Sequence, residues 1–109
     1  MKKKYQPKIL DILEFLKTNK LYLKEQYGVS DIGVFGSFYR NENKPNSDID
    51  ILVEFREQRF NFWAGLKIFL EKELNTEIDL IIKAPYHAQN QYAKRFLNRI
   101  EKEIIYMNY

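Results

Sequence analysis

The sequence predicts a small domain of the α/β (α+β) class, in which helices flank a small mixed β-sheet. Short apolar runs rich in β-branched residues occur at 32–35, 48–55 and 77–82, and their length and composition are typical of buried strands. Apolar residues at helical spacing fill segments before, between and after these runs. The 109 residues, 45% of them hydrophobic, suffice for one core, so we expect a single domain over residues 1–109.

The first third of the chain predicts a helix that leads into a strand. Residues 8–20 carry one apolar stripe at helical spacing, which consists of Ile9, Ile12, Leu13 and Leu16. The helical tendency resumes over 22–27, and Gly28 then stops it. Residues 32–35 follow as a short apolar strand that runs directly into Gly36-Ser37.

The rest of the chain predicts two further strands and two further helices. A polar loop at 41–47 precedes the clearest strand, 48–55. A helix with one apolar face is expected over 60–74, and a third strand over 77–82. Beyond it, apolar residues repeat at steps of three and four, which predicts a helix over 86–107; they are Ala93, Phe96, Leu97, Ile100 and Ile104. This order predicts helices packed on a covered face of the sheet.

Composition excludes several kinds of site and location. The chain has no cysteine, which excludes disulfides, thiolate zinc sites and cysteine nucleophiles but leaves oxygen-ligated metals. No apolar run approaches the ~20 residues of a membrane span. Polar residues also interrupt the segment after the basic N-terminus, so we expect a cytoplasmic protein with no membrane partner.

Residues 42–79 carry nine acids against five bases in a chain of net charge +3. A metal–nucleotide site flanked by cationic surface fits this pattern, although solvated helix faces would also produce it.

Three aspartates are the candidate catalytic and metal-ligating residues. Asp48 and Asp50 are two apart on a strand, so their side chains share one face at a spacing of ~6–7 Å. Carboxylates this close repel each other unless a cation lies between them, and Mg²⁺ prefers such oxygen ligands. Asp79 interrupts an aliphatic strand, where a lone buried charge is costly. If that strand lies beside the first pair, the three carboxylates can hold two Mg²⁺ ions for phosphoryl transfer.

The Gly36-Ser37 pair is a candidate nucleotide-binding turn. A glycine after a buried strand lets the backbone approach a phosphate closely, and we expect Ser37 to add a hydroxyl and an N–H group at a helix start. Arg40, one turn further on, can reach the same phosphates through its guanidinium group. Gly-Ser pairs are usually turns and Asp-x-Asp pairs usually surface carboxylates. Their order along the chain, rather than any one of them, therefore indicates a site.

The spacing of these residues resembles that of the minimal nucleotidyltransferases of the polymerase-beta-like superfamily. The motif Gly-Ser-x(10)-Asp-x-Asp covers residues 36–50, within matching segments at 34–40 and 46–53, and the third acid follows in the segment 77–80. The likeness extends over nearly the whole chain, including the helix expected after the third strand. Two positions depart from the pattern, which often has a small residue before the arginine and a glycine after it. Here they are Tyr39 and Asn41, which bear on the substrate more than on activity.

The resemblance implies an activity, cofactors and a partner. Many of these proteins are MntA-type antitoxins, each paired with a helical HEPN-domain toxin that is an RNase. In that family the antitoxin transfers AMP from ATP to a tyrosine of the toxin and so blocks it. By resemblance, Gly36 and Ser37 hold the ATP phosphates. Asp48 and Asp50 ligate Mg²⁺, and Asp79 activates the acceptor hydroxyl.

Three alternatives remain open. The acceptor could be a small hydroxylated molecule, as in antibiotic nucleotidyltransferases with the same core, although those usually use a second domain to hold the drug. The chain could also be an antitoxin that blocks its toxin by binding alone, with inactive acids. Nucleic-acid binding through the two basic ends of the chain is the third. These ends comprise Lys2 to Lys4 and the C-terminal set Lys94, Arg95, Arg99 and Lys102. Acids interleave with the C-terminal set, as on an ordinary solvated helix face, so we expect no nucleic-acid partner.

Overall fold

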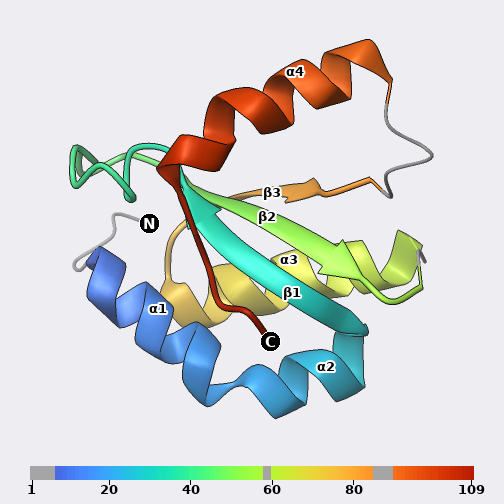
Figure 1. Ribbon diagram of the computed structural model, residues 1–109. Coiled ribbons are helices and arrows are strands. Elements are labelled where there is room, and N and C mark those ends of the chain that lie inside the picture. The colour runs from blue at the N-terminus through green and yellow to red at the C-terminus, as the bar shows by residue number, and fades with distance from the viewer. Residues whose placement is uncertain (1–6, 58–59, 85–89) are drawn as a thin grey trace.

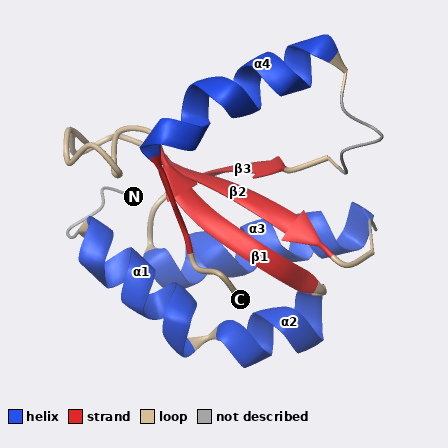
Figure 2. Cartoon of the chain, in the orientation of Figure 1, coloured by secondary structure: helices blue, strands red, loops and turns tan. Residues whose placement is uncertain are grey.

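A four-stranded sheet is the centre of the computed structural model, which describes residues 7–57, 60–84 and 90–109 (Figure 1, Figure 2). The strands are β1 (Val29–Phe35), β2 (Ile49–Phe55), β3 (Ile78–Ile82) and β4 (Ile104–Tyr106). The helices are α1 (Ile9–Thr18), α2 (Lys20–Tyr27), α3 (Phe60–Leu74) and α4 (Gln91–Ile100), and a short 3₁₀ helix (Glu101–Glu103) follows α4. No helix within the described ranges is long and apolar enough to cross a membrane.

The strand order β3-β2-β1-β4 makes the sheet mixed. β1 runs antiparallel to both β2 and β4, whereas β2 and β3 are parallel. A parallel pair needs a crossover connection, and α3 supplies it between β2 and β3. Helices α1, α2 and α3 cover one face of the sheet, and α4 lies over the other (Figure 1). The predicted class, an α/β (α+β) domain with a small mixed sheet and flanking helices, is confirmed.

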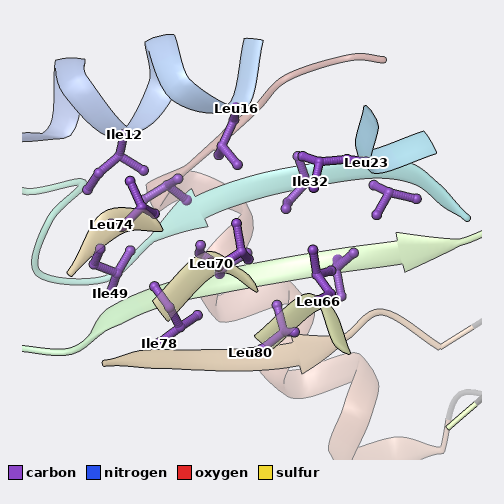
Figure 3. Packing of buried hydrophobic residues seen from close by; sticks show 14 of the residues in the cluster. Ile12, Leu16, Leu23, Ile32, Ile49, Leu66, Leu70, Leu74, Ile78 and Leu80 are labelled. Carbon is purple, nitrogen blue, oxygen red and sulfur yellow. The ribbon is translucent and has the colours of Figure 1, made fainter. Parts of the chain in front are cut away.

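The larger hydrophobic core lies between the sheet and helices α1, α2 and α3 (Figure 3). Ile49, Ile51 and Val53 alternate along β2 toward this core and are fully buried, as their period of two predicts. A smaller core joins Leu52 of β2 to its neighbours on α4 and β1, which are Phe35, Leu97 and Ile100. Because side chains two apart on a strand share a face, Asp50 points to the same side of the sheet as Leu52.

The helix expected over residues 86–107 is confirmed for Gln91–Ile100 and is wrong beyond Ile100. α4 ends at Ile100, and after the 3₁₀ turn Ile104–Tyr106 pairs with β1 as β4. The start of that expected helix, up to residue 89, lies outside the described residues. Ile104 fits the helical repeat, but strand pairing places it opposite Phe35. Its side chain reaches Gly33, where an added Cβ would lie 2.9 Å from Ile104 Cδ1. Pairing with a distant strand therefore overrides local apolar spacing.

The residues after β4 fasten the end of the chain to the larger core. Met107 N–H donates to the Ile32 carbonyl oxygen at 2.8 Å and so extends the pairing with β1. The Tyr109 hydroxyl donates to the Leu16 carbonyl oxygen on α1. Burial raises the pKa of that hydroxyl, and the Asp31 carboxylate adds to the rise. The partly buried Tyr109 side chain thus packs against the larger core.

Candidate active site

β1 ends in a tight turn over residues 36–41, at the end of the sheet where β2 and β3 begin. The carbonyl oxygens of Gly36 and Ser37 accept hydrogen bonds from the N–H groups of Arg40 at 3.1 Å and Glu42 at 2.9 Å. The segment closes as a turn and does not continue as a helix, so the expected helix start at Ser37 is wrong. Within the described part of the chain, the Ser37 N–H group has no backbone acceptor and is available to an anion.

Gly36 brings the turn into direct contact with the acidic residues of β2. Its φ of +76° lies in the left-handed region that glycine adopts without steric cost. A Cβ added to Gly36 would lie only 2.1 Å from the Asp50 Oδ2 atom. The Asp50 carboxylate therefore rests on the glycine Cα, in space that any other side chain would take. The two parts of the predicted motif, ten intervening residues apart, meet at this contact.

The register of the parallel strands places Asp79 beside Asp50, with Asp50 and Asp79 as Cα partners. The pKa of the Asp50 carboxyl is raised from 3.8 to about 6, and burial is the largest cause of this rise. The adjacent Asp79 carboxyl adds to this through its charge and a hydrogen bond, and Asp48 adds a smaller repulsion. The Arg40 guanidinium acts in the opposite direction. The other two predicted aspartates and the predicted arginine thus all act on the Asp50 carboxylate.

The exposure of the three acids differs from the expectation for Asp79. Asp48 and Asp79 are exposed, whereas Asp50 is half-buried. Asp79 is therefore not a charge buried within an aliphatic strand. Its neighbours Ile78 and Leu80 are buried in the core on the α3 side, while Asp79 points to the opposite face. The Asp79 carboxylate stays in contact with water, so its ionised form carries little desolvation cost. The site is therefore open to solvent.

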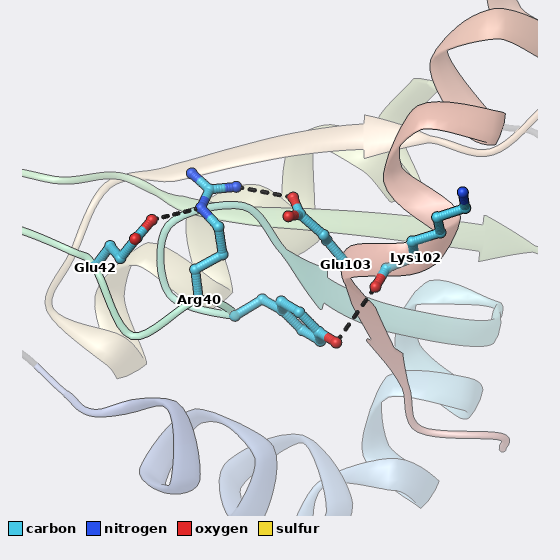
Figure 4. A network of polar contacts seen from close by, with 5 residues as sticks. Arg40, Glu42, Lys102 and Glu103 are labelled. Carbon is cyan, nitrogen blue, oxygen red and sulfur yellow. Dashed lines mark hydrogen bonds and ion pairs between the residues drawn. The ribbon is translucent and has the colours of Figure 1, made fainter.

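The Arg40 guanidinium forms ion pairs with two glutamates (Figure 4). Its Nε atom lies 2.8 Å from Glu42 Oε1, and its Nη1 atom lies 3.0 Å from Glu103 Oε2 in the 3₁₀ helix. These pairs raise the pKa of the guanidinium, so Arg40 stays cationic. Asn41 has a φ of 57°, so this asparagine adopts the left-handed geometry at the position where the family often has glycine.

The chemistry of the acids suits a divalent cation, but the acids are not arranged as a finished metal site. Among the described residues, no group of three or more acidic or histidine side chains forms a ready metal-binding cluster. Asp50 and Asp79 instead lie side by side on neighbouring strands, and the charge of Asp79 helps to raise the pKa of Asp50. A cation bound by these oxygens would offset that charge. The donor set therefore fits Mg²⁺, with Asp48, Asp50 and Asp79 as the residues that would hold it.

The sequence reasoning missed a set of side chains that support β3 from α3. Lys67 and Glu71 form an ion pair of 3.1 Å, and both also bond the backbone of Ile78, next to Asp79. Asp48 and this pair line a hollow of about 420 Å³ together with Asn75, Thr76, Glu77 and Ile78. The i,i+4 spacing of opposite charges was visible in the sequence, but it indicates only a helix-surface pair.

Comparison with known proteins identifies the family. The model described as "Nucleotidyltransferase domain" matches residues 16–107. This chain belongs to the nucleotidyltransferase domain family. One relative, a candidate protein adenylyltransferase of Methanocaldococcus jannaschii (MJ1379), is 41% identical over 89% of this chain and 95% of its own length. Another, protein adenylyltransferase MntA of Thermococcus cleftensis, is 41% identical over 68% of this chain and 76% of its own.

Solved structures share the nucleotidyltransferase fold. A candidate minimal nucleotidyltransferase has a TM-score of 0.69 and 27% identity over 91% of this chain and 95% of its own. A chain from a toxin–antitoxin crystallised with AMP-PNP has a TM-score of 0.61 over 84% of this chain and 71% of its own. Its identity of 18% supports the fold alone. The resemblance to minimal nucleotidyltransferases is therefore confirmed as family membership.

Proposed function

We propose that this nucleotidyltransferase transfers AMP from ATP to a tyrosine hydroxyl of a partner HEPN-domain toxin and thereby neutralises it. The observation that carries the proposal is the meeting of Gly36, Asp50 and Asp79 at one end of the sheet. That arrangement combines an anion-binding turn with carboxylates suited to a divalent cation. The names of the relatives, among them protein adenylyltransferase MntA, support AMP as the transferred group.

In this mechanism the triphosphate of ATP lies over the 36–41 turn. The N–H group and hydroxyl of Ser37 bind phosphate oxygens. The Arg40 guanidinium releases its ion pair with Glu103 and binds the pyrophosphate instead, where its positive charge stabilises the leaving group. Asp48, Asp50 and Asp79 would hold Mg²⁺, which supplies positive charge that stabilises the developing negative charge on the phosphates. Asp79, the exposed acid beside Asp50, takes the proton of the attacking hydroxyl. A new oxygen–phosphorus bond forms at the α-phosphate, and the bond to pyrophosphate breaks.

A protein acceptor suits the openness of the site. Asp48 and Asp79 are exposed, so a hydroxyl carried on another folded protein can reach them. A protein also brings its own binding surface, whereas a small molecule would need an enclosing pocket on this chain. The toxin–antitoxin neighbour shows that a protein of this fold can work in such a pair. We place the reaction in the cytoplasm, where ATP is present, and propose that residues 1–109 form one catalytic domain.

The test is transfer of label from ATP radiolabelled at its α-phosphate to a co-purified HEPN-domain protein encoded beside this gene. We expect label on the partner, loss of labelling with EDTA, and at least a ~100-fold lower rate for Asp50→Asn, because a metal-ligating charge is lost. Glu25→Gln removes an exposed carboxylate from α2, at the opposite end of β1, and is the matched control. Labelling by Asp50→Asn at the wild-type rate would exclude the proposed site.

The same assay decides between the alternatives. If the partner is neutralised without label, and still neutralised when all three aspartates are replaced by asparagine, the chain acts by binding and occlusion. If label appears only in a small molecule, the acceptor is not the toxin. Either result would overturn the proposed reaction while leaving family membership intact.

A further inference from the structure

The outer edge of β3 is covered by side chains of α3 instead of by another strand. β3 is the last strand of the described sheet, and its backbone groups that point away from β2 need other partners. Trp63 Nε1 donates to the Leu80 carbonyl oxygen at 2.9 Å. Lys67 Nζ donates to the Ile78 carbonyl oxygen at 2.6 Å, and Ile78 N–H donates to Glu71 Oε2 at 3.0 Å. We call Trp63, Lys67 and Glu71 the edge clamp.

The edge clamp is possible because its side chains are spaced along α3 at nearly the same distance as the outward-facing backbone groups along β3. Its members are spaced by four residues, so they lie on one side of α3 about 6 Å apart along the axis. Ile78 and Leu80 are two residues apart on β3, about 6.6 Å. The two spacings agree closely enough for successive helix side chains to reach successive outward-facing groups of the strand. The Lys67–Glu71 ion pair of 3.1 Å ties two members to each other.

Asp79 lies between the two residues that the edge clamp holds. Its own Cα is paired with that of Asp50 on the inner side, so Asp79 is fixed from both edges of β3. Because Asp50 and Asp79 are partners in the strand register, any movement of the start of β3 away from β2 would separate their carboxylates. An edge strand has a neighbouring strand on one side only, and the contacts from α3 oppose this movement on the other.

We propose that the edge clamp, through Lys67 and Glu71, is a positioning device that holds Asp79 at the distance from Asp50 that nucleotidyl transfer requires. This inference rests on the proposed function of the acids. Lys67 and Glu71 act through the Ile78 backbone and do not themselves take part in the reaction. A displacement of about 1 Å at a catalytic group costs as much as 100-fold in rate, so loss of these bonds lowers turnover while the fold persists.

The variant that tests this positioning role is Lys67→Met, which keeps the aliphatic stem and removes the donor to the Ile78 carbonyl. Lys67→Arg restores a donor at the same place. Lys72→Met, on the exposed side of α3, is the matched control with the same change of charge. In the labelling assay we expect kcat to fall at least ~10-fold for Lys67→Met with KM for ATP within about twofold, because the phosphate-binding turn is untouched. Lys67→Arg recovers most of kcat, and Lys72→Met retains it.

Amide hydrogen exchange gives a readout that does not depend on catalysis. In Glu71→Ala, exchange at the Ile78 and Asp79 amides is expected to accelerate at least ~10-fold, while amides at the far end of β2 keep their protection. If the wild-type chain transfers no label, the proposed function fails, and this exchange pattern alone decides whether the clamp positions the strand. Wild-type kcat in Lys67→Met, or unchanged exchange at Asp79 in Glu71→Ala, overturns the inference. Equal loss of protection across the whole sheet in Glu71→Ala also overturns it, since the residue would then serve overall stability.

Discussion

Replacing Asp50 by asparagine is expected to stabilise the metal-free protein while it removes activity. In the folded state, burial and two neighbouring carboxyls raise the pKa of Asp50 from 3.8 to about 6. A raised acid pKa means that the ionised form is disfavoured by folding. Above about pH 6 the native protein bears this cost in full, and below the unfolded value of 3.8 the cost is absent. Asparagine keeps the shape and carries no charge.

The size of the effect follows from the shift. Each unit of pKa corresponds to about 1.4 kcal/mol, so the full shift would be worth about 3 kcal/mol at neutral pH. Asp50 is only half-buried, and solvent screening reduces this to about 1–2 kcal/mol. In a domain of this size such a gain raises Tm by roughly 4–8 °C.

The assay is thermal unfolding followed by circular dichroism, in EDTA, from pH 4 to pH 8. The Tm of Asp50→Asn should match wild type near pH 4 and exceed it increasingly up to about pH 7. Magnesium should then raise the Tm of wild type more than that of the variant, because ligation relieves the same repulsion. Glu25→Gln, the control, should show no such growth with pH. A variant that is less stable than wild type at pH 8, or a difference that is constant with pH, would refute the reasoning.

Three further substitutions test other contacts of the fold. Gly36→Ala should lose about 1 kcal/mol or more from its left-handed φ, and its Cβ should displace the Asp50 carboxylate and reduce AMP transfer at least ~10-fold, measured by urea unfolding and labelling. Gly33→Ala should cost about 1–3 kcal/mol in urea unfolding by separating β4 from β1; a neutral result would contradict the tight Gly33–Ile104 contact. Tyr109→Phe should cost about 1 kcal/mol through the lost bond to the Leu16 carbonyl, and an unchanged midpoint in urea would show that the terminal contact is dispensable.

Most elements of the fold could be predicted from local pattern. The alternation of Ile49, Ile51 and Val53 predicts a strand with one buried face, and the apolar stripe of α1 predicts a helix, because both periods are properties of neighbouring residues. β4 could not be predicted in this way. Its first residue, Ile104, continues a helical repeat, and only the presence of β1 alongside makes the extended conformation preferable.

The candidate site likewise has features that local spacing predicts and features that depend on how distant segments pack. Spacing alone singled out Gly36, Asp48 and Asp50, since the motif is local and two residues apart on a strand must share a face. The convergence of Asp79 depended on a condition that the sequence left open, namely that its strand lies beside β2, and the parallel register meets it. The glutamate partners of Arg40 and the exposure of Asp79 were not foreseen, because they depend on where separate segments pack.

By itself, the sequence determined the strands and helices up to β3, the family-typical motif and the identity of the acids, because these follow from residue type and short spacing. Tertiary structure alone decided the strand order, the terminal strand and the contact of the Asp50 carboxylate with Gly36. It also decided the hydrogen bonds from side chains of α3 to the outer edge of β3. These features join residues far apart in the chain, and their energies arise only when the whole core closes and places the segments together.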